Sequence, residues 1–234
     1  MSVEAELADL GNRAAPRKGR RLRAFVRNPT FVAGVIILSF FVLLAIFANL
    51  LFPDDPQDMV APPVLWPGDD AAFPLGSDSL GRDVLARLVY GARASLLVGF
   101  AAAAIGLAIG MVVGAAAGFF GGWTDTILMR LVELFQTTPT FLLVVVIVAI
   151  REPTLTTIAL AIGLASWPTV ARLMRAQFRS LRESDFVMAA RSLGYSRLRI
   201  IVQEILPNAL PPVIVAASVM IANAILTEAG LSFL

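Results

Sequence analysis

Residues 185–211 read D-F-V-M-A-A-R-S-L-G-Y-S-R-L-R-I-I-V-Q-E-I-L-P-N-A-L-P and lie between two long apolar runs. The pattern predicts two short helices, over about residues 181–193 and 196–205, separated by Gly194. Glycine readily adopts the left-handed backbone conformation that ends one helix and turns the chain. Pro207 suits the first turn of the next helix, where no amide donor is needed. We predict that this arginine-bearing pair docks a partner; an interfacial helix pair without a partner is the alternative.

The composition places the chain among membrane proteins. A hydrophobic fraction of 58% over 234 residues is too high for an ordinary soluble domain and indicates an all-α polytopic membrane protein. The chain has no Cys and no His, which excludes disulfides and removes the commonest general base and metal ligand. Lys18 is the only lysine, so a G-x4-G-K-[ST] phosphate loop is absent. No catalytic, cofactor-binding or metal-binding residue is therefore singled out, and if the protein works with ATP, another chain must bind it.

The first two segments are a basic tail and an apolar run. Residues 1–29 carry seven Arg or Lys against three acidic residues. A basic tail directly before a membrane span indicates a cytoplasmic anchor rather than a nucleic-acid-binding arm. Residues 30–52 are long enough, at about 1.5 Å per residue, to cross a hydrocarbon core of roughly 30 Å. This run is too long for the apolar part of a cleavable signal peptide, so we expect the first transmembrane span.

Residues 53–93 are the longest polar segment and contain seven Asp and no Lys. An acid-rich segment without Lys belongs outside by the positive-inside rule. Its six prolines indicate an ordered extracytoplasmic loop rather than a flexible linker. The spacing of the aspartates fits no calcium loop, so we expect them to form a solvated surface.

Residues 94–234 carry four more expected spans, over about 94–120, 126–150, 154–174 and 205–226. Glycines recur every four residues in the first of these, on one helical face where another helix can approach closely: Gly106, Gly110, Gly114 and Gly118. Pro139 should kink or unwind the second, either to line a translocation path or simply to pack. Residues 172–204 carry seven Arg against three acidic residues, which predicts the cytoplasmic side.

Three stretches resemble the membrane subunits of ABC importers. The cytoplasmic E-A-A-x3-G-x9-I-x-L-P loop of those proteins matches at five positions: Ala189, Ala190, Gly194, Leu206 and Pro207. Met188 and Glu204 depart from it, standing where the motif has Glu and Ile. Residues 73–83, F-P-L-G-S-D-S-L-G-R-D, closely resemble a segment before the second span of dipeptide/oligopeptide/nickel-type permeases. Residues 227–234, T-E-A-G-L-S-F-L, resemble the E-A-x-L-S-F-L-G-L-G segment of the same family.

This resemblance identifies the chain as a member of the dipeptide/oligopeptide/nickel-type permeases, with a type I ABC importer fold. It implies a division into a cytoplasmic tail (1–29), a first span (30–52), an extracytoplasmic loop (53–93) and a permease core (94–234) containing a cytoplasmic coupling element (178–206). Five spans are expected in this sequence, with the C-terminus outside, whereas the family typically has a sixth.

The resemblance also implies partners. The chain would be the non-catalytic transmembrane subunit of an ATP-driven importer in the bacterial cytoplasmic (inner) membrane, with its N-terminus in the cytoplasm. A second homologous permease would supply the other half of the translocation path. Two cytoplasmic ATPase subunits would bind ATP and Mg²⁺, and an extracytoplasmic binding protein would deliver the solute. Membrane lipid would surround the spans, and no nucleic acid is expected. The family leaves the solute open among dipeptides, oligopeptides, nickel complexes and other small solutes.

The coupling to the ATPases would run through residues 185–207. The residues implied in it are Arg182, Met188, Ala189, Ala190, Arg191, Gly194, Arg197, Arg199, Leu206 and Pro207. The arginines would pair with the ATPase surface, and the alanines and the glycine would permit close approach. For each arginine, simple anchoring on the positive-inside side is an equally good interpretation.

A secondary transporter or an intramembrane enzyme without ATPase partners is the alternative function. Such proteins usually place ionisable residues inside the membrane as relays or catalysts. The expected spans offer few such residues: Arg130 and Glu133 near one interface, and Glu228 near the outer edge. A transporter without an internal charged relay needs an external energy source, which favours the ATP-driven importer.

Overall fold

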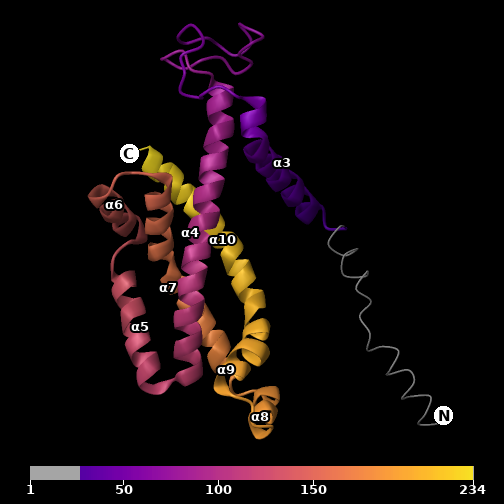
Figure 1. The fold of residues 1–234 in the computed structure, drawn as a ribbon, viewed down its shortest axis with the longest axis vertical. Helices are drawn as coiled ribbons and strands as arrows, with labels where there is room; N and C mark the ends of the chain where they lie inside the picture. The colour runs from indigo at the N-terminus through magenta and orange to yellow at the C-terminus, as the bar shows by residue number, and fades with distance from the viewer. Residues whose placement is uncertain (1–26, 234) are drawn as a thin grey trace, which may run out of the picture. The chain divides into compact units, whose positions relative to one another are not determined.

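The structure is a computed structural model that describes residues 27–233. The chain divides into two units, residues 1–93 and 94–234, and the described residues fold into helices joined by irregular loops (Figure 1). Within residues 27–233, four helices are long and apolar enough to cross a membrane, and a sharply bent helix pair gives a fifth span if it is counted as one. The predicted basic tail lies outside the described residues except for residues 27–29.

In the described part of the first unit, helix α3 (Pro29–Leu51) corresponds to the predicted first span. Asn28 caps this helix by accepting a hydrogen bond from the Thr30 N–H at 3.1 Å, and Pro29 occupies its first turn. Only Ala45 and Ala48 are buried along it. A helix that is apolar on all sides and almost unburied has the surface of a segment that faces lipid.

The loop that follows α3 is folded around its F-P-L-G-S-D-S-L-G-R-D motif. Gly76 and Gly81 have φ angles of +72° and +77°, which favour glycine. A Cβ atom at Gly76 would lie 2.1 Å from the Leu65 carbonyl oxygen, and one at Gly81 would lie 2.2 Å from that of Ala61. The motif therefore lies directly against the backbone of the loop's own first half, and only glycine fits at these two contacts.

Asp78 holds this loop together. Its Oδ1 accepts hydrogen bonds from the N–H groups of Leu80 at 2.8 Å and Arg82 at 3.0 Å. Its Oδ2 accepts from Arg82 Nε at 2.8 Å and Arg87 Nη1 at 2.5 Å. The hydrogen bond from the Arg82 N–H, followed by those from Leu80 and the Arg82 side chain, lowers the pKa of Asp78 to about 2. The loop is thus ordered by its own polar contacts.

Helix α4 (Val84–Phe120) begins earlier than the predicted second span. Residues 53–93 were expected to be a loop throughout, but they are helical from Val84 onward. The polar first turns of α4 are supported inside the first unit, where Tyr90 Oη donates to the Phe52 carbonyl oxygen and Arg93 Nη1 donates to Asn49 Oδ1, both at 2.8 Å. Hydropathy marks only the apolar part of a helix, which is why the prediction began too late.

The second unit is built around helix α7 (Leu155–Leu181). It packs against α5 (Gly122–Thr137), α6 (Thr140–Ile150) and α10 (Leu206–Ser232) (Figure 1). In the most apolar 18-residue stretch of α7, 56% of the residues are buried, compared with 22% in the corresponding stretch of the span that ends in α10. Helix α7 is therefore the central helix of this unit.

The four glycines predicted to form a packing face lie against other helices of the second unit: Gly106, Gly110, Gly114 and Gly118. A Cβ atom at Gly110 would lie 2.5 Å from Val170 Cβ, and one at Gly114 would lie 2.3 Å from the Ala171 carbonyl oxygen. Val170 and Ala171 belong to α7 and are fully buried. Along this seam α4 and α7 are in backbone contact, which the four-residue spacing of the glycines permits.

The third predicted span is broken at the predicted proline. Helix α5 ends at Thr137, α6 begins at Thr140, and the two are bent by 82°. Thr138 between them is extended, with φ −92° and ψ 133°. A residue before proline is disfavoured from the helical region, and proline has no N–H to continue the ladder. The predicted break at Pro139 is confirmed, and it is larger than a kink.

Candidate functional site

The arginine-rich segment lies at the end of the second unit opposite to the C-terminus (Figure 1). Helix α7 continues to Leu181, a short turn follows, and α8 spans Asp185–Ser192. The first short helix was expected from residue 181, but Leu181 is the last residue of α7 and residues 182–184 form the turn before α8. After a second turn, α9 (Arg197–Arg199) and a π-helical segment, η1 (Ile200–Ile205), lead without interruption into α10.

Gly194 ends α8 in the left-handed conformation that the sequence predicted. Its φ angle is +77°, and the N–H groups of Gly194 and Tyr195 donate to the carbonyl oxygens of Arg191 at 2.9 Å and Ala190 at 3.1 Å. A Cβ atom at Gly194 would meet nothing within 4 Å. This position therefore requires glycine for its backbone conformation and not for space.

Helix α8 is fastened to the core of the second unit by one face. Val187 is fully buried and Ala190 is 5% exposed, and both pack in a cluster that includes Phe178 of α7 and Ile205 of η1. Ala190 was predicted to allow the close approach of a partner, but its methyl group lies inside the chain's own core. The motif alone could not show which alanine faces inward; Ala189 is the exposed one of the pair.

The remaining residues of the predicted coupling set surround this core. Those that are exposed are Met188, Ala189, Arg191, Gly194, Arg197, Arg199 and Pro207. Arg182 is half-buried, and Leu206 is half-buried against the core cluster of α7 and η1. Large apolar side chains are exposed beside the arginines, with Leu193 at 73% and Leu198 at 71%. The segment thus presents a mixed basic and apolar surface.

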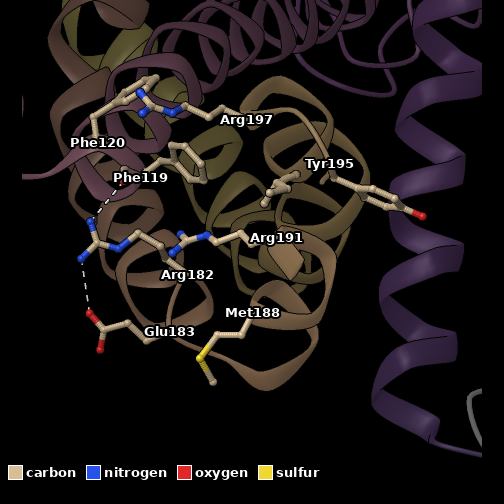
Figure 2. Close-up of a pocket in the computed structure, with 9 residues that line it drawn as sticks. Phe119, Phe120, Arg182, Glu183, Met188, Arg191, Tyr195 and Arg197 are labelled. Carbon is tan, nitrogen blue, oxygen red and sulfur yellow. Dashed lines mark hydrogen bonds and ion pairs between the residues drawn. The ribbon is translucent and has the colours of Figure 1, made fainter. Parts of the chain in front are cut away.

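An open cavity of about 680 Å³ lies between this segment and the end of α4 (Figure 2). Its lining consists of Phe119, Phe120, Arg182, Glu183, Met188, Arg191, Tyr195, Arg197 and Ile200. Figure 2 shows the side chains of Arg191 and Arg197 extending toward the end of α4. Phe119 and Phe120 were not predicted to line a site. In the sequence they are marked only as an aromatic pair directly before Gly121-Gly122.

The arginines of this region differ in their partners. Arg182 Nη1 donates to the Phe119 carbonyl oxygen at 3.1 Å, and its Nη2 pairs with Glu183 at 3.3 Å. Arg199 lies 3.8 Å from the centroid of the Tyr195 ring. Within residues 27–233, the guanidinium groups of Arg191 and Arg197 have no ion-pair or hydrogen-bond partner. Two unpaired guanidinium groups at one opening favour a ligand that carries carboxylates.

A bidentate ion pair braces the same end of the unit. Asp125 in the first turn of α5 accepts from Arg175 Nε and, at 2.6 Å, from Arg175 Nη2. Arg175 lies on α7, so the pair fixes α5 to the central helix near the place where α8 is attached. This pair could not be predicted from the sequence, because Asp125 and Arg175 are distant along the chain.

Two family models match the chain. Residues 85–234 match the binding-protein-dependent transport system inner membrane component. Residues 19–65 match the N-terminal TM domain of oligopeptide transport permease C.

Curated relatives cover most of the chain. The dipeptide transport system permease protein DppC of Alkalihalophilus pseudofirmus is 40% identical over 208 residues, which are 89% of this chain and 68% of that protein. DppC of Haemophilus influenzae is 37% identical over 215 residues, 90% of this chain and 73% of the relative. The oligopeptide transport system permease protein OppC of Bacillus subtilis is 35% identical over 221 residues, 90% of this chain and 68% of the relative.

A solved structure supports the fold independently. A chain of the MetNI methionine ABC transporter, in an inward-facing conformation, superposes with a TM-score of 0.52 at 22% identity and covers 61% of this chain and 71% of its own length. The motif-based prediction of the family is therefore confirmed. This chain belongs to the inner membrane component family of binding-protein-dependent transport systems, as a multi-pass permease subunit of the dipeptide/oligopeptide/nickel type with the type I ABC importer fold.

Proposed function

We propose that this chain forms half of the translocation path of an ATP-driven peptide importer and couples to cytoplasmic ATPases through α8 and the turn that follows it. The peptide class is supported by the dipeptide and oligopeptide permeases that it resembles at 35% to 40% identity. A second permease, two ATPases that bind ATP and Mg²⁺, and an extracytoplasmic binding protein complete the proposed assembly.

The proposed orientation follows from the charge distribution. The arginine-rich segment and the N-terminus face the cytoplasm, and residues 53–83 with the start of α4 lie outside. Because the chain has no Cys, a single introduced cysteine can be labelled cleanly. A membrane-impermeant thiol reagent should label an Asp69→Cys variant in intact cells; failure to label it while permeabilised cells are labelled would reverse the topology.

The unpaired Arg191 and Arg197 carry the coupling proposal. They lie at the open cavity on the basic side of the chain, next to exposed apolar residues. A surface with uncompensated positive charge and apolar neighbours is suited to an acidic and partly apolar protein surface. Carboxylates of an ATPase would pair with the two guanidinium groups, and apolar side chains would cover residues such as Leu198.

The attachment of α8 explains how such docking would be transmitted. Val187 and Ala190 hold α8 against α7 and η1 in a close-packed core, and η1 continues into α10. Close-packed interiors have low compressibility and transmit displacement. When the ATPases close on ATP, a displacement of α8 would therefore move the inner ends of α7 and α10 with it.

Charge reversal tests this proposal. The double substitution Arg191→Glu and Arg197→Glu places like charges against the expected carboxylates, without altering any buried residue. We expect the ATPase subunits to be lost from the purified complex and peptide uptake to fall by roughly 100-fold or more, since like charges at an interface cost several kcal/mol and each 1.4 kcal/mol is about a factor of ten. Arg151→Glu, an exposed arginine in the turn before α7, is the matched control. Normal uptake with bound ATPases in the double variant would contradict the coupling role.

A further inference from the structure

A second cavity opens within the spans of the second unit. It has a volume of about 660 Å³, lies between α6, α7 and α10, and is in the size range of small-molecule sites in proteins. Its polar lining residues are Thr140, Ser166, Thr169, Asn223 and Thr227, and its other lining residues are apolar. No residue with a charged side chain lines it.

The polar groups of this cavity divide into two sets. Ser166 Oγ donates to the Ile162 carbonyl oxygen at 2.6 Å, and Thr227 Oγ1 donates to that of Asn223 at 2.8 Å, so these hydroxyls are bonded within their own helices. The side chains of Thr140, Thr169 and Asn223 are exposed and have no hydrogen-bond partner in the described part of the chain. One carboxamide and two hydroxyls are thus free to bind a ligand.

These free groups lie deep within helices that are long enough to span the membrane. At about 1.5 Å per residue, Asn223 lies roughly 14 Å from Ser232 at the end of α10, and Thr169 roughly 21 Å from Leu155 at the start of α7. A hydrocarbon core is about 30 Å thick, and both groups lie on helices that are long and apolar enough to cross it. Polar groups without partners are costly in hydrocarbon, and water, a solute or another chain must satisfy them.

The break in the third span occurs at the same place. Thr140 and Phe141 line the cavity and begin α6, directly after Pro139. Non-helical backbone at membrane depth is tolerated where it is buried in protein or lines a water-filled cavity. The broken helix and the free side chains therefore point independently to an aqueous or ligand-filled space.

We propose that this cavity is the part of the translocation path where this chain holds its solute, and that it recognises uncharged hydrogen-bonding groups of the peptide-amide type. The carboxamide of Asn223 can donate to a backbone carbonyl and accept from a backbone N–H, and each free hydroxyl can do either. The rest of the cavity wall is lined by apolar residues such as Ile162 and Val219. These residues form no hydrogen bonds, so they would not select among the polar side chains of a bound peptide. This inference rests on the proposed importer function and assigns the solute site within it.

The side chains that line the cavity distinguish between a peptide and a nickel complex, two of the solutes that the family resemblance leaves open. A nickel ion or a charged complex would be served by carboxylate or imidazole ligands, and residues 27–233 contain no cluster of three or more such metal-binding side chains. A peptide backbone, by contrast, finds both donors and acceptors in the lining. The cavity thus favours a peptide over a metal as the cargo.

Two near-isosteric substitutions test the site in the complete complex with its partner permease, ATPases and binding protein. Asn223→Leu and Thr169→Val remove the free polar groups and keep the volume. With radiolabelled dialanine and trialanine as probes, we expect the double variant to import peptide at least about tenfold more slowly, because two hydrogen-bonding partners of the solute are lost. Its ATPase subunits should remain bound. Ser218→Ala, on the same helix but outside the cavity, is the control and should transport normally.

The outcomes separate this inference from the importer function. If the unaltered complex imports neither peptide, the proposed function is wrong. If it imports peptide and the double variant does so equally fast, the cavity is not the solute site although the importer function stands. Accessibility gives a second readout: an Asn223→Cys variant should react with a small water-soluble thiol reagent and be protected by peptide. An unreactive cysteine that instead crosslinks to the second permease would show that a helix of that chain fills the cavity, and would overturn the proposal.

Discussion

Replacing Gly114 by alanine perturbs the fold at the closest contact of the α4–α7 seam. The added Cβ would lie 2.3 Å from the Ala171 carbonyl oxygen and 2.7 Å from Met174 Cβ. Carbon atoms of real side chains essentially never approach other atoms closer than 3.0 Å. The nearest atom belongs to the backbone of a fully buried α7 residue, so no side-chain rotation can relieve the contact.

The magnitude follows from two opposing effects. Reaching the 3.0 Å limit requires the helices to separate by at least 0.7 Å at this point, the difference between 3.0 and 2.3 Å. Overpacking of this kind typically costs about 1–3 kcal/mol. Alanine is favoured over glycine in a helix interior by about 0.5–1 kcal/mol, which offsets part of the cost. We therefore expect a net loss of roughly 1–2 kcal/mol for Gly114→Ala, and a much larger loss for Gly114→Leu.

Gly91 supplies the matched control on the same helix. A Cβ atom there would meet nothing within 4 Å, so Gly91→Ala should be neutral or stabilising by up to about 1 kcal/mol. The assay measures the midpoint of thermal unfolding of the purified complex in mild detergent. The Gly114→Ala complex is compared directly with the Gly91→Ala complex. If Gly114→Ala melts at or above the temperature of Gly91→Ala, the seam is looser than the structure indicates and the close-contact argument is wrong.

Two further predictions concern polar contacts. The lowered pKa of Asp78 means that its stabilising contribution is complete above the usual carboxyl value of 3.8 and is lost as the pH falls through about 2. Cleavage of the loop by pepsin should therefore increase as the pH falls from 3.8 to about 2. In an Asp78→Asn variant the loop should already be cleaved at pH 3.8. Cleavage of the native loop that does not change with pH would refute this prediction. The buried Glu228 accepts a hydrogen bond from the Ser95 hydroxyl at 2.7 Å. Glu228→Leu removes this acceptor and should lower the free energy of unfolding by roughly 1–3 kcal/mol, whereas Glu228→Gln keeps an acceptor and should lower it less. Equal melting temperatures of the two variants would contradict this prediction.

Local backbone chemistry made part of this fold predictable. Gly194 was expected to be left-handed and has φ +77°, and Pro139 was expected to interrupt its span and separates two helices bent by 82°. The four-residue spacing of glycines such as Gly110 predicted a packing face, because such spacing keeps them on one side of a helix. In each case a few neighbouring residues determine the feature.

The parts that sequence could not predict depend on contacts between distant segments. Ala190 was expected to face a partner, but the packing of α8 on α7 turns it into the core. Asp125 lies fifty positions from the arginine that binds it, and neither residue reveals the other. The two cavities are likewise formed by side chains from separate helices, so their positions could not be predicted even where single lining residues, such as Arg191, were.

Helix α7 connects the features that matter for transport. Its last residues pack against α8, its middle lies in backbone contact with α4 along the glycine seam, and Ser166 and Thr169 on it line the membrane cavity. The seam brings the α4 glycines against the α7 backbone and against the side chains of Val170 and Met174, so a displacement of α7 should carry α4 with it. In the proposed function, a displacement of α8 by an ATPase would then reach the cavity through α7. In the proposed coupling, the glycine seam would therefore have a mechanical role as well as a stabilising one, because it holds α4 against α7 between α8 and the membrane cavity.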